Sequence, residues 1–455
     1  MKRWRLKALM MFTEYPATWE KTTIANVYNI ISGGTPDTKV PDYWNGTIPW
    51  ISSADISDLG DVFPRRYITQ NAVTKSATNI APAGSLLVVT RVGLGKVSLA
   101  TQRICFSQDI QALIGNDSLV YPKYAHYYLA KAVQVFKHKN QGTTISGVTK
   151  KHLSDLPFFL PPYKEQIRIV SKIENLFSNL DAGVASLERA KAKLTQYRAA
   201  LLQAAVEGQL NKHHAYSWRH YSMQELVFQY QNGIAKRSGT TGTEYKVLRL
   251  ADIQNNAISE SNPRHIHLSD KEIARYRLNN GDLVAIRVNG SKDLVGRLVY
   301  VRDEKDWAYC DHFIRLRIDE RKAHPKFIKF LFDTKKFRNK IQELMVSSAG
   351  QNTISQSSFN EITVRVPSLD EQKIIISQIE RYLGVIFKIE QSLNRDFTRA
   401  SRLRQAILKK AFEGNLVPQD PNEEPASVLL ERIQRERERA TPTSVKRKAS
   451  KKNLK

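Results

Sequence analysis

One stretch of the chain occurs twice, and this repeat constrains the fold more than any other feature. Residues 161–210 and residues 367–416 align without a gap over their whole length. Such an alignment keeps every residue at a fixed angle and rise, which a long helix requires and a loop does not. Both copies begin after proline and end in Glu-Gly, which are typical start and stop signals of a helix. We therefore expect two matched helices of about 44 residues, each roughly 65 Å long.

The apolar residues of each copy recur at every seventh position, which is the period of a coiled coil. Residues 395–397 interrupt this pattern in the second copy. We interpret the copies as two rods that pack on each other, or on a partner, and hold two other units a set distance apart. The alternative is that each apolar seam is the core stripe of an ordinary helical bundle. The expected seam residues are Ile173, Leu180, Leu187, Leu194 and Leu201 in the first copy and Ile379, Ile386, Leu393, Ala400 and Ile407 in the second.

Two non-helical blocks accompany the helices, at residues 17–160 and 218–366. Each has turn-rich punctuation between short runs of β-sheet composition, followed by a candidate helix. Local matches link the blocks, such as Gly142–Ser146 with Gln351–Ser355, and indicate a tandem duplication of one block plus one long helix. The expected strands are 48–51, 86–92, 245–250, 282–288, 297–301 and 313–318. The expected helices run from Pro122 to about Lys137 and from Pro325 to about Leu344.

The composition narrows the choice of partner and compartment. The formal net charge of +26 indicates a polyanionic partner, nucleic acid before membrane. Cys105 and Cys310 are the only cysteines, which excludes a disulfide framework and suits a reducing cytoplasm. There is no run of 18 apolar residues, so we expect no membrane-spanning helix. The basic start has too short an apolar core for a signal peptide, and we expect an extension with Met10 or Met11 as an alternative start.

Two motifs resemble parts of catalytic sites. Leu160-Pro161-Pro162-Tyr163 is similar to the motif of adenine N6-methyltransferases, but that motif begins with an amide or carboxylate that accepts from the target amine. Leucine cannot accept a hydrogen bond. Asp370-Glu371-Gln372-Lys373 contains the end of a nuclease metal site, but its duplicate at residues 164–167 lacks the lysine. A cap at the positive end of a helix explains both copies.

Two other segments invite a ligand-binding interpretation. Gly93-Leu94-Gly95-Lys96 lacks the spacing of a phosphate loop, and it predicts a tight turn that presents Lys96. A second group lacks four closely spaced metal ligands, so polar loop residues are the favoured interpretation. We therefore expect no catalytic residue and no metal site on this chain, which has the features of a binding protein. The second group consists of His265, His267, Cys310, Asp311 and His312.

The turns of both blocks supply the side chains that a DNA-reading loop needs. Arginine and lysine suit phosphates and guanine edges, asparagine and glutamine suit adenine edges, and small hydroxyls suit either. In the first block the candidates are Thr35, Lys39, Tyr43, Trp44, Ser52, Ser53, Arg91, Lys96, Thr144, Ser146, Lys150 and Lys151. In the second block they are Lys236, Arg237, Arg249, Arg287, Asn289, Ser291, Lys292, Arg297, Asn352 and Ser355.

Four segments together resemble the specificity subunit of type I restriction–modification enzymes. They are SGGTP…YWNGTIPWISSADI at 32–56, QGTTISGVTKKHLSDLPFFLPPYKEQIRIVSKIENLFSNLDAG at 141–183, RAALLQAAVEGQL at 198–210 and LKKAFEGNLVPQDPNEEPASVLLERI at 408–433. The last two are the most specific. The resemblance covers nearly the whole chain and leaves the basic start at 1–9 and the lysine-rich end at 441–455 without an assignment.

The resemblance implies an α+β fold with internal pseudo-two-fold duplication, in which two globular α/β target-recognition domains are separated by two long antiparallel coiled-coil helices. The expected segments are a basic extension at 1–16, the first recognition domain at 17–160, a spacer helix at 161–210, the second recognition domain at 211–366, a second spacer helix at 367–416, and a linker, short charged helix and basic tail at 417–455.

The resemblance also implies a function and partners. The chain would bind a bipartite, asymmetric site on double-stranded DNA, one half-site per domain, and dock two methyltransferase subunits and the restriction subunits. N6-adenine methylation and ATP-driven cleavage would belong to those partners, together with S-adenosylmethionine, ATP and Mg²⁺, so this chain would carry no cofactor. One alternative is a basic coiled-coil scaffold that bridges nucleic acid to another protein machine. Another is a self-contained modification enzyme, which the missing methyl-donor loop and Leu160 disfavour.

Overall fold

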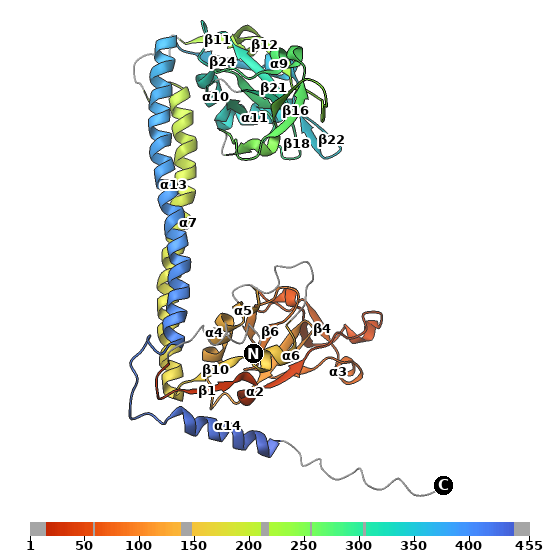
Figure 1. Cartoon of the computed structure of the whole chain (residues 1–455), viewed down its shortest axis with the longest axis vertical. Helices are drawn as coiled ribbons and strands as arrows, with labels where there is room; N and C mark the ends of the chain where they lie inside the picture. The colour runs from red at the N-terminus through yellow and green to blue at the C-terminus, as the bar shows by residue number, and fades with distance from the viewer. Residues whose placement is uncertain are drawn as a thin grey trace, which may run out of the picture. The chain divides into compact units, whose positions relative to one another are not determined.

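The protein is described by a computed structural model over residues 15–57, 60–137, 148–210, 218–254, 257–303 and 306–440 (Figure 1). It divides into two compact units, which are Met1–Ala185 with Phe397–Lys455, and Ser186–Asp396. Each unit therefore contains one globular domain and one end of each long helix. The predicted Thr144 and Ser146 lie outside the described residues.

The repeated stretches form the two long helices, as predicted. Helix α7 spans Tyr163–Val206 and helix α13 spans Leu369–Phe412, and each has 44 residues. In the first unit the beginning of α7 shares a core with the end of α13, where Phe177 and Phe412 belong to one cluster. In the second unit the end of α7 shares a core with the beginning of α13. The helices consequently pair in antiparallel orientation within each unit.

The predicted seam is buried toward the ends of α7, whereas on α13 it is buried along most of the helix. Ile173 and Leu201 are buried on α7, and Ile379, Ile386, Leu393 and Ala400 are buried on α13. The seam residues nearer the middle of α7 are only half-buried. Helix α13 also continues without a break through the segment that interrupts the heptad pattern. The half-buried seam residues are Leu180, Leu187, Leu194 and, on α13, Ile407.

The first domain builds two four-stranded sheets, in the orders β2-β9-β6-β7 and β4-β3-β8-β5, and a two-stranded pair β1-β10. Its elements are β1 (Glu20–Thr23), α2 (Ile24–Val27), β2 (Asn29–Ser32), η1 (Pro41–Tyr43), β3 (Ile48–Ile51), η2 (Ser53–Asp55), β4 (Arg66–Ile68), α3 (Gln70–Lys75), β5 (Ile80–Ala81), β6 (Leu86–Val89), β7 (Val97–Leu99), β8 (Ile104–Phe106), β9 (Ile110–Ile114), α4 (Pro122–Ala132), α5 (Gln134–Lys137), α6 (Lys150–Ser154) and β10 (Pro157–Leu160).

The second domain repeats this plan with the sheet β12-β21-β17-β19, the sheet β16-β13-β20, the pair β11-β24, and two small additions, β14-β15 and β18-β23-β22. Its elements are β11 (Arg219–Ser222), α8 (Met223–Leu226), β12 (Val227–Asn232), β13 (Thr243–Leu248), η4 (Leu250–Asp252), β14 (Ile253–Gln254), β15 (Ala257–Ile258), β16 (Arg264–Leu268), α9 (Asp270–Tyr276), β17 (Leu283–Ile286), β18 (Val288–Asn289), β19 (Leu298–Tyr300), β20 (Trp307–Tyr309), β21 (Phe313–Ile318), α10 (Pro325–Asp333), α11 (Lys335–Leu344), β22 (Val346–Ser348), β23 (Gln351–Thr353), α12 (Gln356–Asn360) and β24 (Thr363–Val366).

The strand order shows the duplication directly. The four-stranded sheets β2-β9-β6-β7 and β12-β21-β17-β19 take their strands from the same places in the two sequences. In both domains one strand pair is parallel, β3 with β8 and β13 with β20. In both, an antiparallel pair leads directly into a long helix, through β10 and β24. The strand pairing of the two domains matches while their side chains differ. The two domains therefore share one architecture and have different surfaces.

Two predicted helices are each divided in the structure. The helix expected from Pro325 to about Leu344 breaks at Thr334, whose backbone is extended and whose hydroxyl donates to the carbonyl of Leu331 at 2.7 Å. That side-chain hydrogen bond replaces the bond that the next helical turn would have made. The helix expected from Pro122 likewise divides, at Val133 between α4 and α5. Both expectations of one continuous helix are therefore wrong.

A duplicated Glu-Gln pair attaches each domain to its long helix. The side chain of Gln166 accepts from the backbone N–H of Tyr121 at 2.7 Å, and the side chain of Gln372 accepts from the backbone N–H of His324 at 2.7 Å. Tyr121 and His324 are the N-cap residues of α4 and α10. Both glutamines are fully buried, so each amide fixes the start of a domain helix against the start of a rod.

The preceding glutamates make a second duplicated contact. Glu165 accepts from the indole N–H of Trp19 at 3.0 Å, and Glu371 accepts from that of Trp218 at 3.1 Å. Burial raises the pKa of Glu165, and hydrogen bonds from Gln419 and Trp19 act against that rise. The prediction of a helix-start cap for these acids thus holds for their position, but their carboxylates bind side chains of the domains.

The segment after α13 completes the first unit. Gln419 donates to Glu165 at 3.0 Å, and the Arg168 guanidinium pairs with Glu423. Helix α14 (Ala426–Ala440) follows, as the predicted short charged helix, and buries Leu429 and Ile433 in the core of the first domain. The two ends of the described chain therefore share one hydrophobic core.

None of the helices in the described part of the chain combines the length and the apolar composition that crossing a bilayer requires.

Replacing Gln372 by leucine should destabilise the second unit by about 2–4 kcal/mol, because the substitution leaves a buried N–H and the carbonyl of Pro367 without partners. Unfolding of the full chain in urea, followed by circular dichroism, measures the effect. The matched control is Gln391→Leu at an exposed position of the same helix, which should change stability by less than about 0.5 kcal/mol. Equal effects of the two substitutions would contradict the attachment role.

Candidate nucleic-acid interface

Several predicted DNA-contacting residues of the first domain are bound inside the domain. The hydroxyl of Thr35 donates to Gln108 at 2.6 Å, and the indole of Trp44 donates to the carbonyl of Asp37 at 3.1 Å. The hydroxyl of Ser52 donates to Asp55 at 2.8 Å, and Ser53 is buried. These side chains shape the loops between β2 and β4. Their internal hydrogen bonds hold the loops in place, and their contact with DNA stays a prediction.

The tight turn at residues 91–95 forms as predicted, but Lys96 does not project from it. Gly93 and Gly95 both adopt positive φ, which a glycine accepts without strain. The ammonium group of Lys96 donates to the carbonyl of Ile56 at 2.8 Å and so ties the turn to the loop after η2. The expectation that the turn presents Lys96 is therefore wrong. Arg91, at the opposite side of the turn, is exposed.

The first domain keeps a set of exposed cations at its loop ends. Arg91 follows β6, and Lys150 and Lys151 begin α6. Lys39 lies in the loop before η1, close in sequence to the half-buried Tyr43. No described residue forms an ion pair or side-chain hydrogen bond with these four cations. Unpaired arginine and lysine at loop ends are suited to contacting phosphates.

In the second domain, three predicted cations are held in ion pairs. Arg249 binds Asp252 through two of its nitrogens, at 2.9 and 3.1 Å, and also donates to the carbonyl of Asn262. Arg237 pairs with Asp311 at 2.8 Å. Lys236 pairs with Glu272 at 3.4 Å. The Arg249 pair lies within one turn, whereas Arg237 and Lys236 link their loop to Asp311 and to helix α9, so all three pairs help to shape the domain; their contact with DNA stays a prediction.

Some of the predicted polar residues around β18 form hydrogen bonds inside the domain, and others are exposed. Asn289 accepts from the backbone N–H of Ser291 at 2.8 Å, and Ser355 caps α12 by accepting from Ser358 at 3.0 Å. Arg297 donates to the carbonyl of Asp293 at 2.7 Å. In contrast, Ser291 and Lys292 are exposed at the turn tip. The half-exposed guanidinium of Arg287 has no partner among the residues that the structure describes.

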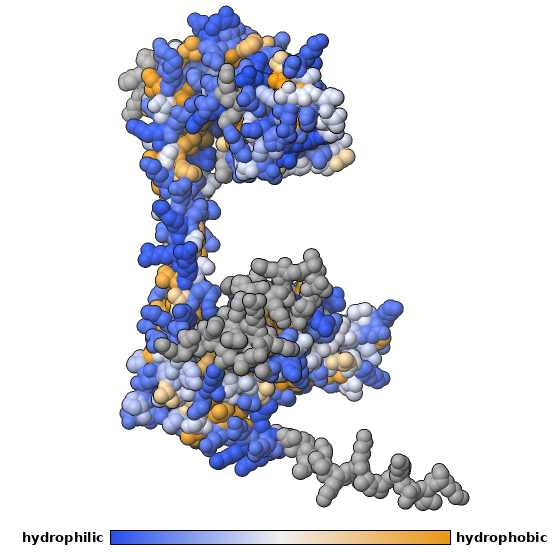
Figure 2. Space-filling model, in the orientation of Figure 1, coloured by the Kyte–Doolittle hydropathy of each residue, from blue (hydrophilic) through white to orange (hydrophobic). Residues whose placement is uncertain are grey.

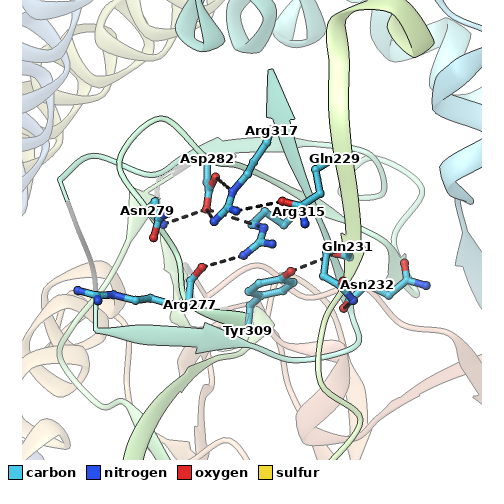
Figure 3. Close-up of polar contacts among 9 residues, drawn as sticks. All are labelled: Gln229, Gln231, Asn232, Arg277, Asn279, Asp282, Tyr309, Arg315 and Arg317. Atoms are coloured by element: carbon cyan, nitrogen blue, oxygen red, sulfur yellow. Dashed lines mark hydrogen bonds and ion pairs between the residues drawn. The ribbon is translucent and has the colours of Figure 1, made fainter. Parts of the chain in front are cut away.

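A buried charge network joins the two main sheets of the second domain (Figure 3). Asp282, just before β17, binds Arg317 at 2.9 Å and lies 3.9 Å from Arg315, both on β21. Arg315 donates to the carbonyl of Arg277 at 2.8 Å, and its guanidinium lies over the ring of Tyr309 on β20. Burial lowers the pKa of Arg315. The Asp282 carboxylate thus interacts with two arginine side chains of β21.

The neighbouring Cys310, Asp311 and His312 could in principle hold a metal ion, because their ligand atoms lie within 4.8 Å of one another. Asp311 is already bound by Arg237, however, and Cys310 lies 3.7 Å from the His312 ring nitrogen. Burial raises the pKa of the Cys310 thiol, which opposes the thiolate form that binds metals. The predicted interpretation as polar loop residues is the one that this geometry favours.

Exposed apolar side chains gather on the long helices (Figure 2). Ile374, Val385 and Ile389 on α13 are about half exposed. Their spacing places them on one face of the helix, away from the buried seam. Exposed apolar stripes on otherwise hydrophilic helices are typical of protein-binding surfaces.

Sequence reasoning missed the residues that attach the domains to the helices and the hairpin formed by β22 and β23. The sequence did contain a signal for the attachment residues, because the Glu-Gln pair and a preceding tryptophan recur in both halves. The hairpin turn at Ala349-Gly350 carried only a weak signal, since a glycine at its second position is common in many turns.

The chain is thus basic and carries two copies of one α/β architecture, each with exposed or half-exposed cations at its loop ends. The family model for the type I restriction modification DNA specificity domain matches residues 16–192 and 227–396. The chain belongs to this family, and it carries two copies of the domain.

Relatives extend over nearly the whole chain. The chain is 30% identical to the StySPI specificity subunit of Salmonella potsdam, over 93% of this chain and 96% of that one. It is 25% identical to the EcoKI specificity subunit of Escherichia coli K12, over 96% of this chain and 99% of that one. Because these relatives are specificity subunits, the predictions of that family and of a non-catalytic subunit are confirmed.

Solved structures agree with the fold. A chain from a type I restriction–modification system, described for its complex assembly and conformational transition, has a TM-score of 0.70 at 18% identity, over 88% of this chain and 99% of that chain. The HsdS subunit from Thermoanaerobacter tengcongensis has a TM-score of 0.54 at 18% identity, over 88% of this chain and 98% of that chain. The predicted α+β fold with internal duplication is thereby confirmed.

Replacing Asp282 by asparagine should destabilise the second domain by about 3–5 kcal/mol, because it leaves the buried Arg315 and the partly buried Arg317 without a compensating charge. The control is Asp306→Asn, which removes an ion pair to Arg277 from a carboxylate that is 79% exposed and should cost at most about 1 kcal/mol. Urea unfolding at neutral pH measures both. A loss below 1 kcal/mol for the Asp282 variant would show that the network contributes little to stability.

Proposed function

We propose that this chain selects the DNA site of a type I restriction–modification complex, and that each recognition domain reads one half of a bipartite site. The observation that carries the proposal is the duplication. Two domains share one strand order and one attachment to the long helices, yet they present different loop residues. Two unlike surfaces on matched frames suit two unlike half-sites.

The free cations support a DNA ligand. Arg91, Lys150 and Lys151 in the first domain, and Arg287 and Lys292 in the second, are available for phosphates or guanine edges. The net charge of +26 adds a long-range attraction that acts before any base is read. Arg91 and Arg287 follow corresponding strands, β6 and β17, but Lys150 and Lys151 of α6 have no cationic counterpart in α12, so the proposed site is asymmetric.

The long helices are proposed to set the spacing between half-sites and to dock methyltransferase and restriction subunits. Helix length supports the first role, because 44 residues correspond to roughly 65 Å at about 1.5 Å per residue. The exposed apolar stripe of α13 at Ile374, Val385 and Ile389 supports the second. In this proposal S-adenosylmethionine, ATP and Mg²⁺ belong to the partner subunits, where N6-adenine methylation and cleavage would take place.

The test is to map N6-methyladenine across the genome of cells with and without this gene, with the methyltransferase partner present in both. We expect a motif of two short half-sites around a fixed spacer to lose its methylation on deletion. The control is the same deletion complemented with the gene, which should restore the motif. A methylation map that deletion leaves unchanged, although the complementing protein is present and folded, would contradict the proposal.

Inserting four helical residues into the middle of α7 should lengthen the spacer of the methylated motif by one to two base pairs, because one added turn is about 6 Å long. The same methylation map is the measurement. The half-sites themselves should stay unchanged, since the insertion leaves both domains intact. A control replaces four exposed residues of α7 without changing its length and should leave the spacer as it was. An unaltered spacer after the insertion would show that helix length does not set the spacing.

A further inference from the structure

The hairpin formed by β22 and β23 stands out in the second domain because its base is fixed and its two-residue tip is exposed. Strand β23 pairs with β18 through Val288–Thr353 and Asn289–Asn352. The backbone N–H of Ile354, which is fully buried, donates to the carbonyl of Arg287 at 3.0 Å. At the other end, a Cβ on Gly350 would meet no atom within 4 Å, and the Gly350 carbonyl lies 3.7 Å from where a Cβ on Gly290 would be. The hairpin therefore projects from a rigid support.

A two-residue turn closes the hairpin. Ser348 pairs with Gln351, so only Ala349 and Gly350 lie between the strands, and both have positive φ, 47° and 78°. Positive φ at both central residues defines the tight type I′ turn that matches the twist of two paired strands. Alanine adopts positive φ at some cost. The hairpin thus has one defined conformation with a narrow end.

The two faces of the hairpin have different roles. Asn352 is buried, and its amide donates to the carbonyls of Asn289 at 3.3 Å and Gly290 at 2.9 Å. Its oxygen accepts from the hydroxyl of Ser347 at 2.6 Å. Both amide hydrogens and the amide oxygen of Asn352 thus have partners inside the domain. Asn352, a candidate base contact from the sequence, braces the hairpin against the turn at Gly290.

The other face is exposed and carries no charge. Successive side chains of a strand point to opposite faces, so Val346 and Ser348 point to one face of the hairpin and Ser347 points to the other. Across from them lie Thr353 and Gln351. Val346 is 69% exposed, and Ser348 and Gln351 are also exposed. This face therefore offers a hydroxyl, an amide with donor and acceptor, and an apolar branch, in a row along one ribbon.

We infer that this outer face, Val346, Ser348 and Gln351, reads base edges of one half-site, with the hairpin lying in the major groove of DNA. The groove is wide enough for a two-stranded ribbon, and glutamine can pair with the adenine edge through two hydrogen bonds. The branched methyls of Val346 suit contact with a thymine methyl. The inference rests on the proposed function, because it assigns base-reading residues to the domain that the proposal places on DNA.

The charge distribution supports base reading over backbone binding for this face. The hairpin from Val346 to Thr353 contains no charged residue. Arg287 lies at its base, next to β18, whereas Lys292 lies in the turn that follows β18, whose Gly290 is close to the hairpin tip at Gly350. Contacts with phosphates, in which lysine and arginine are prominent, fix the position of the protein, whereas contacts with base edges in the groove provide specificity. The two cations therefore flank the hairpin, and its own outer face carries only neutral groups.

The experiment is the methylation map in cells that carry the partner methyltransferase and either the natural chain or Gln351→Ala. We expect discrimination at one or two positions of a single half-site to fall at least about fivefold, since one bidentate contact provides that much. Spacer and second half-site should be unchanged. Gln351→Glu, which removes the amide donors without changing shape, should alter the same positions. The matched control, Gln224→Ala at an exposed site on α8, should change nothing.

The possible outcomes separate the two proposals. If the natural chain directs a split motif and both Gln351 variants keep it with undiminished discrimination, the hairpin inference is overturned while the proposed function stands. If methylation falls equally at all sites while the melting temperature of the purified chain is unchanged, the hairpin contributes general affinity, and base reading is also overturned. If the natural chain directs no motif, the proposed function fails and the inference fails with it.

Discussion

A fully buried glutamine amide at the start of each long helix is the interaction on which the rest of the structure depends. Gln166 and Gln372 each accept from the backbone N–H of the N-cap residue of a domain helix, directly before the proline with which that helix begins. An amide so deeply buried has few alternative partners, so a shift of the domain would leave donors unsatisfied. The contact makes the orientation of each domain relative to its attached helix end a fixed property of the chain.

This arrangement explains how two binding surfaces can diverge without losing the frame. The frame is made of backbone pairing, a seam of aliphatic residues and the Glu-Gln contacts, none of which involves the loop ends that carry Arg91 or Arg287. Substitutions at the loop ends therefore change what a domain presents and leave its attachment intact. In the second domain, the buried charge network around Asp282 joins the two main sheets.

The sequence predicted the fold well where the signal was periodic. Both long helices and the strand Phe313–Ile318 have the expected bounds, because heptads and alternating apolar runs reflect burial directly. The break at Thr334 was missed because it depends on one hydroxyl that bonds the backbone. Among candidate contacts, side-chain type alone could not separate the free Arg91 from Lys96, whose ammonium group is bound to a carbonyl elsewhere in the domain.

The contribution of the C-terminal segment to the first core has a consequence for biosynthesis. Phe412, Leu429 and Ile433 pack with residues near the N-terminus, whereas the second unit uses only the continuous stretch 186–396. On the ribosome, the second unit has all of its residues as soon as that stretch has emerged. The first unit, although its domain is translated earlier, must wait for the last helix. The domain that is made first is thus completed last, and truncated chains would expose its unfinished core.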